Sequence, residues 1–374
     1  MLALEQLSTD GWDEVVRCAS GHGVYPIIYK RLESLGSGTN IPELTVQRLR
    51  KVYFHSMKRN MRLYHELSNV CELLREHDIS VIVLKGAALG ELVYQDIALR
   101  PMWDIDLMVK VEDVWRADEA LIQSGCRRTM FPWSKRHMQW AHGFRHLGYM
   151  KGGIEVEIHV GIPELPDLDP WISARPATIN STDAFILSPE NFLLNLCLHL
   201  DRHIHFDSLS LLSFCDIAMA LKRYQEELDW HYVMRIVREH QVEESIHRIL
   251  HVINEGFHGL VPVDVLAGLK SDGVTISINN VLYPDEEPKR MLPPSLSSWL
   301  LDFSRIPSVR NKIYHIYKKL FPCREYMIQY SPGTRPSLVY FYYPVRLCKE
   351  AVRTIRGLLQ LLMYLKNRHV TRKG

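Results

Sequence analysis

The spacing of apolar residues divides the chain into a helical beginning, a strand-rich middle and a helical second half. Residues 3–35 and 43–78 carry apolar side chains at every third or fourth position, which predicts amphipathic helices. The sequence LGSGTNIPE separates them, and Pro42 suits the first turn of a new helix. We expect these segments to form an N-terminal helical layer.

The middle of the chain shows the short runs and the alternation that are typical of strands. The run VIVL before Lys85 is β-branched and predicts an interior strand, and residues 87–95 suit a short helix. A second strand follows in WDIDLMV, and then a helix over 111–125 that ends at Gly125. Residues 126–160 are predicted to be strands with a polar insert.

The second half is again helical. Three helices are predicted over 188–203, 209–224 and 228–240, whereas residues 262–290 lose periodicity and favour a loop. The terminal segment, 345–373, places apolar residues on one side and basic residues on another. It suits an anionic membrane surface, a partner helix or the core of the same protein, and the last of these is favoured over membrane contact.

These elements predict an α+β fold in which a small mixed β-sheet with flanking helices lies between two helical regions. The expected division is a helical layer over 1–78, a sheet core over 79–185 and a helical C-terminal domain over 186–374. With 374 residues, the chain is long enough to bury a substantial core.

Composition narrows the class of protein. The 45 basic residues nearly balance the 43 acidic residues, so no long nucleic acid is expected as a partner. The seven cysteines are scattered without a Cys-x-x-Cys pair, which favours neither a disulfide framework nor a thiolate metal site and fits the cytoplasm. The N-terminus lacks the pattern of a signal peptide, and no run reaches the ~20 apolar residues of a membrane span.

Two carboxylates in the second strand are the strongest candidates for chemistry. Asp104 and Asp106 are two positions apart, so both point to one face of the strand, with backbones roughly 7 Å apart. Carboxylates at that spacing can converge on one cation. The strand 154–160 offers a further acid, but Glu155 and Glu157 share a face and alternation alone does not separate them.

Other polar residues have more ordinary interpretations. The pair His77-Asp78 occurs in metal phosphohydrolases, but here an ordinary helix end is favoured. His199 and His203 have the i, i+4 spacing of zinc ligands, yet no Glu follows His199, which favours paired histidines on the helix surface or in a substrate pocket. Asp216 lies in an apolar helix and is expected to pair with a basic or histidine side chain of the preceding helix.

The order of these motifs resembles the bacterial uncharacterised nucleotidyltransferase family of the DNA polymerase β-like superfamily. The similarity covers most of residues 55–240 and is looser elsewhere. The Asp-x-Asp pair is specific only together with its neighbours. The matching motifs are Leu84-Lys85-Gly86, Tyr94, Arg100-Pro101-Met102, Asp104-Ile105-Asp106-Leu107, Glu157-Ile158-His159, Ser188-Pro189-Glu190, Leu198-His199, His203, Asp216 and Asp229-Trp230.

The resemblance implies a transfer of NMP from an NTP to a hydroxyl of a small molecule or of a peptide or protein. It further implies two Mg²⁺ ions, with Mn²⁺ as a substitute, bound by the catalytic residues Asp104, Asp106 and Glu157. Between Glu155 and Glu157, the spacing to His159 favours Glu157. The resemblance also implies the following contacts: Lys85, Gly86, Ala87 and Arg100 for the nucleotide, and His159, His199 and His203 for the acceptor.

The sequence departs from the commonest superfamily pattern at two positions. Ala87 follows Gly86 where a serine hydroxyl often contacts phosphate, and the third acid is Glu157, one methylene longer than the frequent Asp. A second hypothesis is therefore a nucleotidyltransferase-fold module that has lost catalysis and binds a nucleotide or a protein partner.

Overall fold

The computed structural model describes residues 7–35, 41–129, 146–204, 210–257, 259–269, 309–321 and 340–349. These residues fall into two compact units. The described residues up to Leu269 form the first unit, and 309–321 with 340–349 belong to the second. The predicted domain boundaries at 78/79 and 185/186 both fall inside the first unit and stay a prediction.

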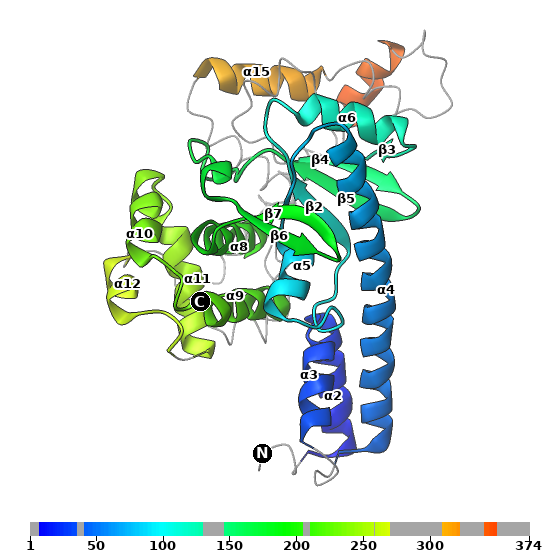
Figure 1. Ribbon diagram of the computed structural model, residues 1–374, viewed down its shortest axis with the longest axis vertical. Coiled ribbons are helices and arrows are strands. Elements are labelled where there is room, and N and C mark those ends of the chain that lie inside the picture. The colour runs from blue at the N-terminus through cyan, green and yellow to red at the C-terminus, as the bar shows by residue number, and fades with distance from the viewer. Residues whose placement is uncertain are drawn as a thin grey trace, which may run out of the picture. The chain divides into compact units, whose positions relative to one another are not determined.

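Three helices form the N-terminal layer that the apolar spacing predicted: α2 (Thr9–Gly21), α3 (Tyr25–Ser34) and α4 (Glu43–Glu76). The hydroxyl of Ser8 caps α2 by accepting from the amide of Gly11 at 3.2 Å. Figure 1 shows α2 and α3 beside the first half of α4. Their apolar faces share one core, to which Trp12 and Leu49 contribute fully buried side chains.

A seven-stranded mixed sheet carries the middle of the chain, in the order β3-β4-β5-β2-β1-β7-β6. The central pair β2 and β5 is parallel, whereas β1–β2 and β4–β5 are antiparallel. The strands are β1 (Ile82–Val83), β2 (Asp104–Met108), β3 (Arg127–Arg128), β4 (His146–Lys151), β5 (Ile154–His159), β6 (Arg175–Ile179) and β7 (Thr182–Ile186).

Short helices connect these strands. The helix predicted after β1 consists of a single turn of α-helix, α5 (Lys85–Ala88), followed by a π-helical turn, η2 (Leu89–Val93). The predicted helix after β2 is α6 (Val114–Gln123). Gly125 follows it with φ of +90°, a conformation that glycine adopts without the steric cost of a side chain.

A 3₁₀ turn, η3 (Pro170–Ser173), lies between β5 and β6 along the chain. The helical second half begins after β7. The helix α11 packs against α8, which also contacts α9. The prediction of a loop over 262–290 is wrong for its first residues, because the helix α12 forms there and buries Val265. The remainder, 270–290, lies outside the described residues. The helices are α8 (Pro189–Ile204), α9 (Leu211–Tyr224), α10 (Trp230–Glu239), α11 (Glu243–Gly256) and α12 (Val263–Gly268).

The second unit contains α15 (Val309–Leu320) and a helical segment within 340–349. There the buried guanidinium of Arg346 donates to the backbone carbonyl of Leu320 at 3.2 Å. Most of the predicted terminal helix, 345–373, lies outside the described residues. No helix in the described part of the chain has the length and apolar character needed to cross a bilayer.

Candidate functional site

The candidate site lies on one face of the sheet, where β2 and β5 pair in parallel. Their register sets Asp104 opposite Glu155 and Asp106 opposite Glu157. Paired residues project to the same face of a sheet, so four carboxylates share this surface. The antiparallel pairing of β4 with β5 adds His146, which lies opposite His159.

Asp106 is the buried centre of the site and is 5% exposed. Its Oδ1 accepts from the ammonium of Lys85 at 2.7 Å and from Nε2 of His159 at 2.8 Å. Burial by itself would raise the pKa of Asp106, but the Lys85 charge and the hydrogen bond from His159 outweigh burial and hold that pKa well below its usual range. Asp106 is therefore a stable carboxylate.

Asp104 has a different environment although it lies on the same strand. Burial, followed by repulsion from the Asp106 carboxylate, raises the pKa of Asp104 to about 6. Lys85 and Arg100 oppose this rise but do not cancel it. The row of acids thus holds more negative charge than its neighbours compensate, which is the condition that a bound divalent cation relieves.

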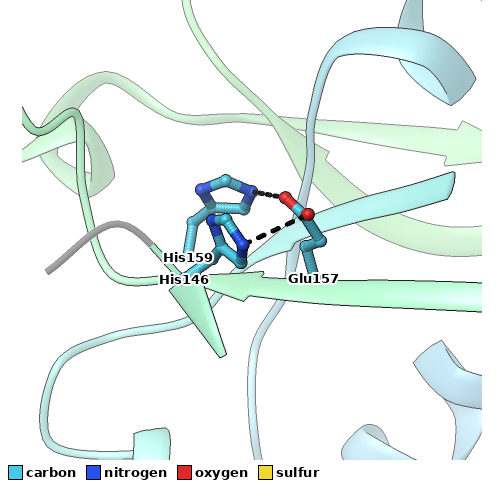
Figure 2. Close-up of side chains that lie close together, drawn as sticks. All are labelled: His146, Glu157 and His159. Carbon is cyan, nitrogen blue, oxygen red and sulfur yellow. Dashed lines mark ion pairs between the residues drawn. The ribbon is translucent and has the colours of Figure 1, made fainter. Parts of the chain in front are cut away.

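The two glutamates of β5 point to different neighbours. Glu157 lies with the two histidines: its Oε1 is 3.2 Å from Nε2 of His146, and its Oε2 is 3.5 Å from Nε2 of His159 (Figure 2). Glu157 also contributes to the raised pKa of Asp104. Glu155 instead accepts from the hydroxyl of Thr129 at 3.4 Å. The geometry therefore favours Glu157 as the acid that joins Asp104 and Asp106.

His146 is a site residue that sequence reasoning missed. Burial lowers its pKa to about 4, although Glu157 opposes the shift, so its imidazole is neutral near pH 7. The sequence feature that could have predicted it is the pair Gly152-Gly153, which forms the turn between β4 and β5 with φ of 58° and 81°. His146 precedes Gly152 by as many residues as His159 follows Gly153, so a two-residue hairpin at this turn pairs the two histidines.

The turn before the site is closely packed. A Cβ on Gly86 would lie 2.5 Å from Nη1 of Arg100 and 3.1 Å from Sδ of Met102, so any larger residue there requires the Arg100 side chain to shift. The carbonyl of Ala87 accepts from the hydroxyl of Tyr64 on α4 at 2.7 Å. Gly86 thus admits the Arg100 guanidinium to this turn.

Arg100 connects the turn to the helical half of the same unit. Its Nη2 lies 3.1 Å from Oδ2 of Asp216 on α9, and the hydroxyl of Tyr94 donates to Oδ1 of that carboxylate at 2.9 Å. The expectation that Asp216 pairs with the preceding helix is therefore wrong. Asp216 needs a partner because it is buried, and two residues far away in sequence supply it.

The two histidines of α8 pair with each other. Nε2 of His203 lies 3.1 Å from Nε2 of His199, and a guanidinium nitrogen of Arg202 donates to Nδ1 of His199 at 3.1 Å. Arginine is only a donor, so neutral His199 carries its proton on Nε2. Burial, followed by the charge of Lys85, holds the pKa of His199 well below its usual range, which places this histidine near the acids. The predicted pairing of these histidines is confirmed, and their place in an acceptor pocket stays a prediction.

The pair His77-Asp78 lies at an ordinary helix end, as predicted. His77 is the C-cap of α4, and its Nδ1 lies 2.9 Å from the carbonyl of Leu73. Asp78 has a positive φ of 53°, as residues that end helices often do.

Comparisons with known proteins point to one family. A family model described as an uncharacterised nucleotidyltransferase matches residues 8–258, more than half of the chain. A comparison with curated proteins gives no significant match.

Two solved structures are similar at low identity. One, described as the antibiotic-resistance factor ANT(2'')-Ia, is 12% identical with a TM-score of 0.36 and covers 52% of this chain and 98% of its own. The other is an antigenic nucleotidyltransferase-like protein from Paracoccidioides brasiliensis, 16% identical with a TM-score of 0.32, covering 59% of this chain and 95% of its own.

Proposed function

Since the chain belongs to the uncharacterised nucleotidyltransferase family, we propose that it transfers NMP from an NTP to a hydroxyl of a small molecule or of a peptide or protein. The observation that carries this proposal is the row of carboxylates Asp104, Asp106 and Glu157 on one face of the paired strands β2 and β5. A row of this kind can bind the cations on which in-line displacement at phosphorus depends.

The donor set fits magnesium. Mg²⁺ prefers oxygen ligands and is usually held by one or two carboxylates together with substrate phosphates, and Asp104, Asp106 and Glu157 supply carboxylates on this face. In the proposal, Asp104, Asp106 and Glu157 hold two Mg²⁺ ions, which Mn²⁺ can replace. When bound, these ions would stabilise the attacking and leaving oxygens of the displacement.

Lys85 is the best candidate for a phosphate contact from a side chain. Its ammonium already lies at the site, 2.7 Å from Asp106, so its charge is available where a triphosphate would bind beside the acids. Gly86 and Ala87 would offer backbone near the same phosphates. Arg100 is held by Asp216, so we propose that it supports the turn and contributes positive charge without leaving that partner.

The acceptor is proposed to bind between the sheet and α8. His159 reaches Asp106 from β5, and His199 lies close enough to Lys85 and Asp106 for their charges to change its pKa. His203 continues this row through its contact with His199.

We propose a cytoplasmic setting, because the six described cysteines, Cys18, Cys71, Cys126, Cys197, Cys215 and Cys348, form no disulfide.

The first test is Mg²⁺-dependent NTP binding by the Asp104→Asn variant. The substitution keeps the size of the side chain but removes one ligand charge, so we expect binding to be lost. Calorimetric titration with each of four NTPs measures it. Asp183→Asn, at an exposed position of β7, is the matched control and should bind like the wild type. If Asp104→Asn also binds NTP and Mg²⁺ like the wild type, the assigned site is wrong.

The second measurement separates an enzyme from a binding module. Pyrophosphate release is followed while cell extract supplies the acceptor, and mass spectrometry detects the adduct. Release that requires Asp104 supports nucleotidyl transfer. Tight nucleotide binding without release against any acceptor would instead favour the non-catalytic module.

A further inference from the structure

We propose that His146, Glu157 and His159 form a binding site for a first-row transition-metal ion at the Glu157 end of the acid row. The site deepens the proposed function, on which its role in transfer rests, because it names a different class of cation for this end. The two histidines and the glutamate come from adjacent strands and gather around one point (Figure 2).

The distances between the donor atoms suit one metal ion. One ligand atom from each of the three residues lies within 4.8 Å of the other two. Nε2 of His146 is 3.2 Å from Oε1 of Glu157, and Nε2 of His159 is 3.5 Å from Oε2. An ion about 2.0–2.2 Å from each donor holds its ligands roughly 3–4 Å apart. The donors are thus already close to the spacing that coordination requires.

The backbone fixes this arrangement. His146 and His159 are direct partners in the antiparallel register of β4 and β5, and Gly148 faces Glu157. The Gly152–Gly153 turn sets that register. Ligands on paired strands need less reorganisation than ligands on separate loops, so binding retains more of its free energy.

The charges of the neighbourhood also favour a divalent cation. Asp104, Asp106 and Glu157 bring three negative charges, and Lys85 brings one positive charge to Asp106. One divalent ion would balance the remaining two negative charges. Nε2 of His159 also donates to Oδ1 of Asp106 at 2.8 Å, so binding of the ion would release this proton to solvent and leave the Asp106 carboxylate beside the ion, toward the oxygen-only end at Asp104.

The donor types decide the class of ion. Two imidazole nitrogens and one carboxylate form a set that suits zinc, cobalt, manganese or iron. Mg²⁺ prefers an all-oxygen environment and retains its waters, so it should compete poorly at this end. At the Asp104 end, where the available ligands are carboxylates, the preference should be the reverse.

The test uses Co²⁺ as the probe. Full-length protein is stripped of metal and titrated with Co²⁺, and the visible absorption of the coordinated ion reports binding. We expect a saturable site that an excess of Mg²⁺ does not displace. His146→Gln should weaken Co²⁺ binding at least about tenfold, a loss that removing even an outer-shell partner of a metal ligand can cause. His231→Gln, at an exposed position of α10, is the matched control and should bind like the wild type.

A second variant excludes a purely structural role. His146→Asp replaces a nitrogen donor with oxygen, so it should shift the preference from Co²⁺ toward Mg²⁺, which a folding defect would not do. Equal Co²⁺ affinity in the wild type and His146→Gln, or displacement of Co²⁺ by equimolar Mg²⁺, would overturn the proposal. Binding of Co²⁺ without pyrophosphate release would leave this site standing while the proposed transfer fails.

Discussion

Two carboxylates that are neighbours on one strand face differ in what surrounds them. Asp106 has two partners within 2.8 Å, and its charge is therefore favourable in the folded protein. Asp104 faces the same acids without a direct partner charge, and its pKa rises to about 6 through burial and the Asp106 charge. At pH 7 the ionised form of Asp104 lowers the free energy of unfolding, which is a cost that binding sites often carry.

We predict that Asp104→Asn stabilises the metal-free protein at pH 7.5. The folded pKa lies above the unfolded value, so the ionised carboxylate is less favourable in the folded state, and an amide removes this cost. The gain, discounted for solvent screening, should be about 1–2 kcal/mol, a rise in Tm of a few degrees. It should shrink as pH falls from 6 and be lost below the ordinary carboxyl pKa of 3.8, where the wild-type carboxyl is protonated in both states. Thermal unfolding at several pH values measures the difference.

Asp106→Asn is the contrasting variant. It leaves the buried Lys85 ammonium without its carboxylate partner, so it should destabilise the protein by about 3–5 kcal/mol. Equal effects of the two substitutions on Tm would contradict the electrostatic difference between the two acids.

At the scale of elements, the site depends on the register between strands. Alternation in the sequence correctly placed Asp104 with Asp106 on one face of their strand and Glu157 with His159 on one face of the other strand. It did not show which neighbours each acid would meet, because Glu155 and Glu157 share their face and differ only in what lies across the sheet. The register of β4, and with it His146, needed the hairpin turn rather than the strand pattern.

The turn after β1 gives a prediction at the same scale. Gly86→Ala should lower the free energy of unfolding by about 1–3 kcal/mol, because the new methyl group would lie 2.5 Å from Nη1 of the buried Arg100. Chemical denaturation measures the loss. Gly21→Ala is the matched control: nothing lies within 4 Å of its added Cβ, and alanine favours the helix there. A Gly86→Ala variant as stable as the wild type would show that Arg100 can move away at little cost.

At the scale of the molecule, local patterns predicted more than distant contacts. The α+β class, the N-terminal helices, the two acidic strands and the helix that ends before Gly125 follow from periodicity and turn residues. The helix predicted over 87–95 contains η2, but its π geometry and the helix α12 were not predicted, because a single π turn and a six-residue helix leave too little periodic signal. The partner of Asp216 was placed on the wrong element, since 116 positions separate it from Arg100.

This distant pair gives the last prediction. Asp216→Asn should destabilise the protein by about 3–5 kcal/mol, because the buried guanidinium of Arg100 and the hydroxyl of Tyr94 both depend on the Asp216 carboxylate. A double-mutant cycle with Arg100→Met isolates the pair from its surroundings. In the Arg100→Met protein no guanidinium charge needs a partner, so Asp216→Asn should lower the free energy of unfolding much less than it does in the wild type. Urea unfolding of the four proteins gives the coupling energy. Additive losses would mean that Arg100 and Asp216 act independently. The turn at Gly86 would then be held by its contacts with α4 alone, such as the hydrogen bond from the Tyr64 hydroxyl to the Ala87 carbonyl.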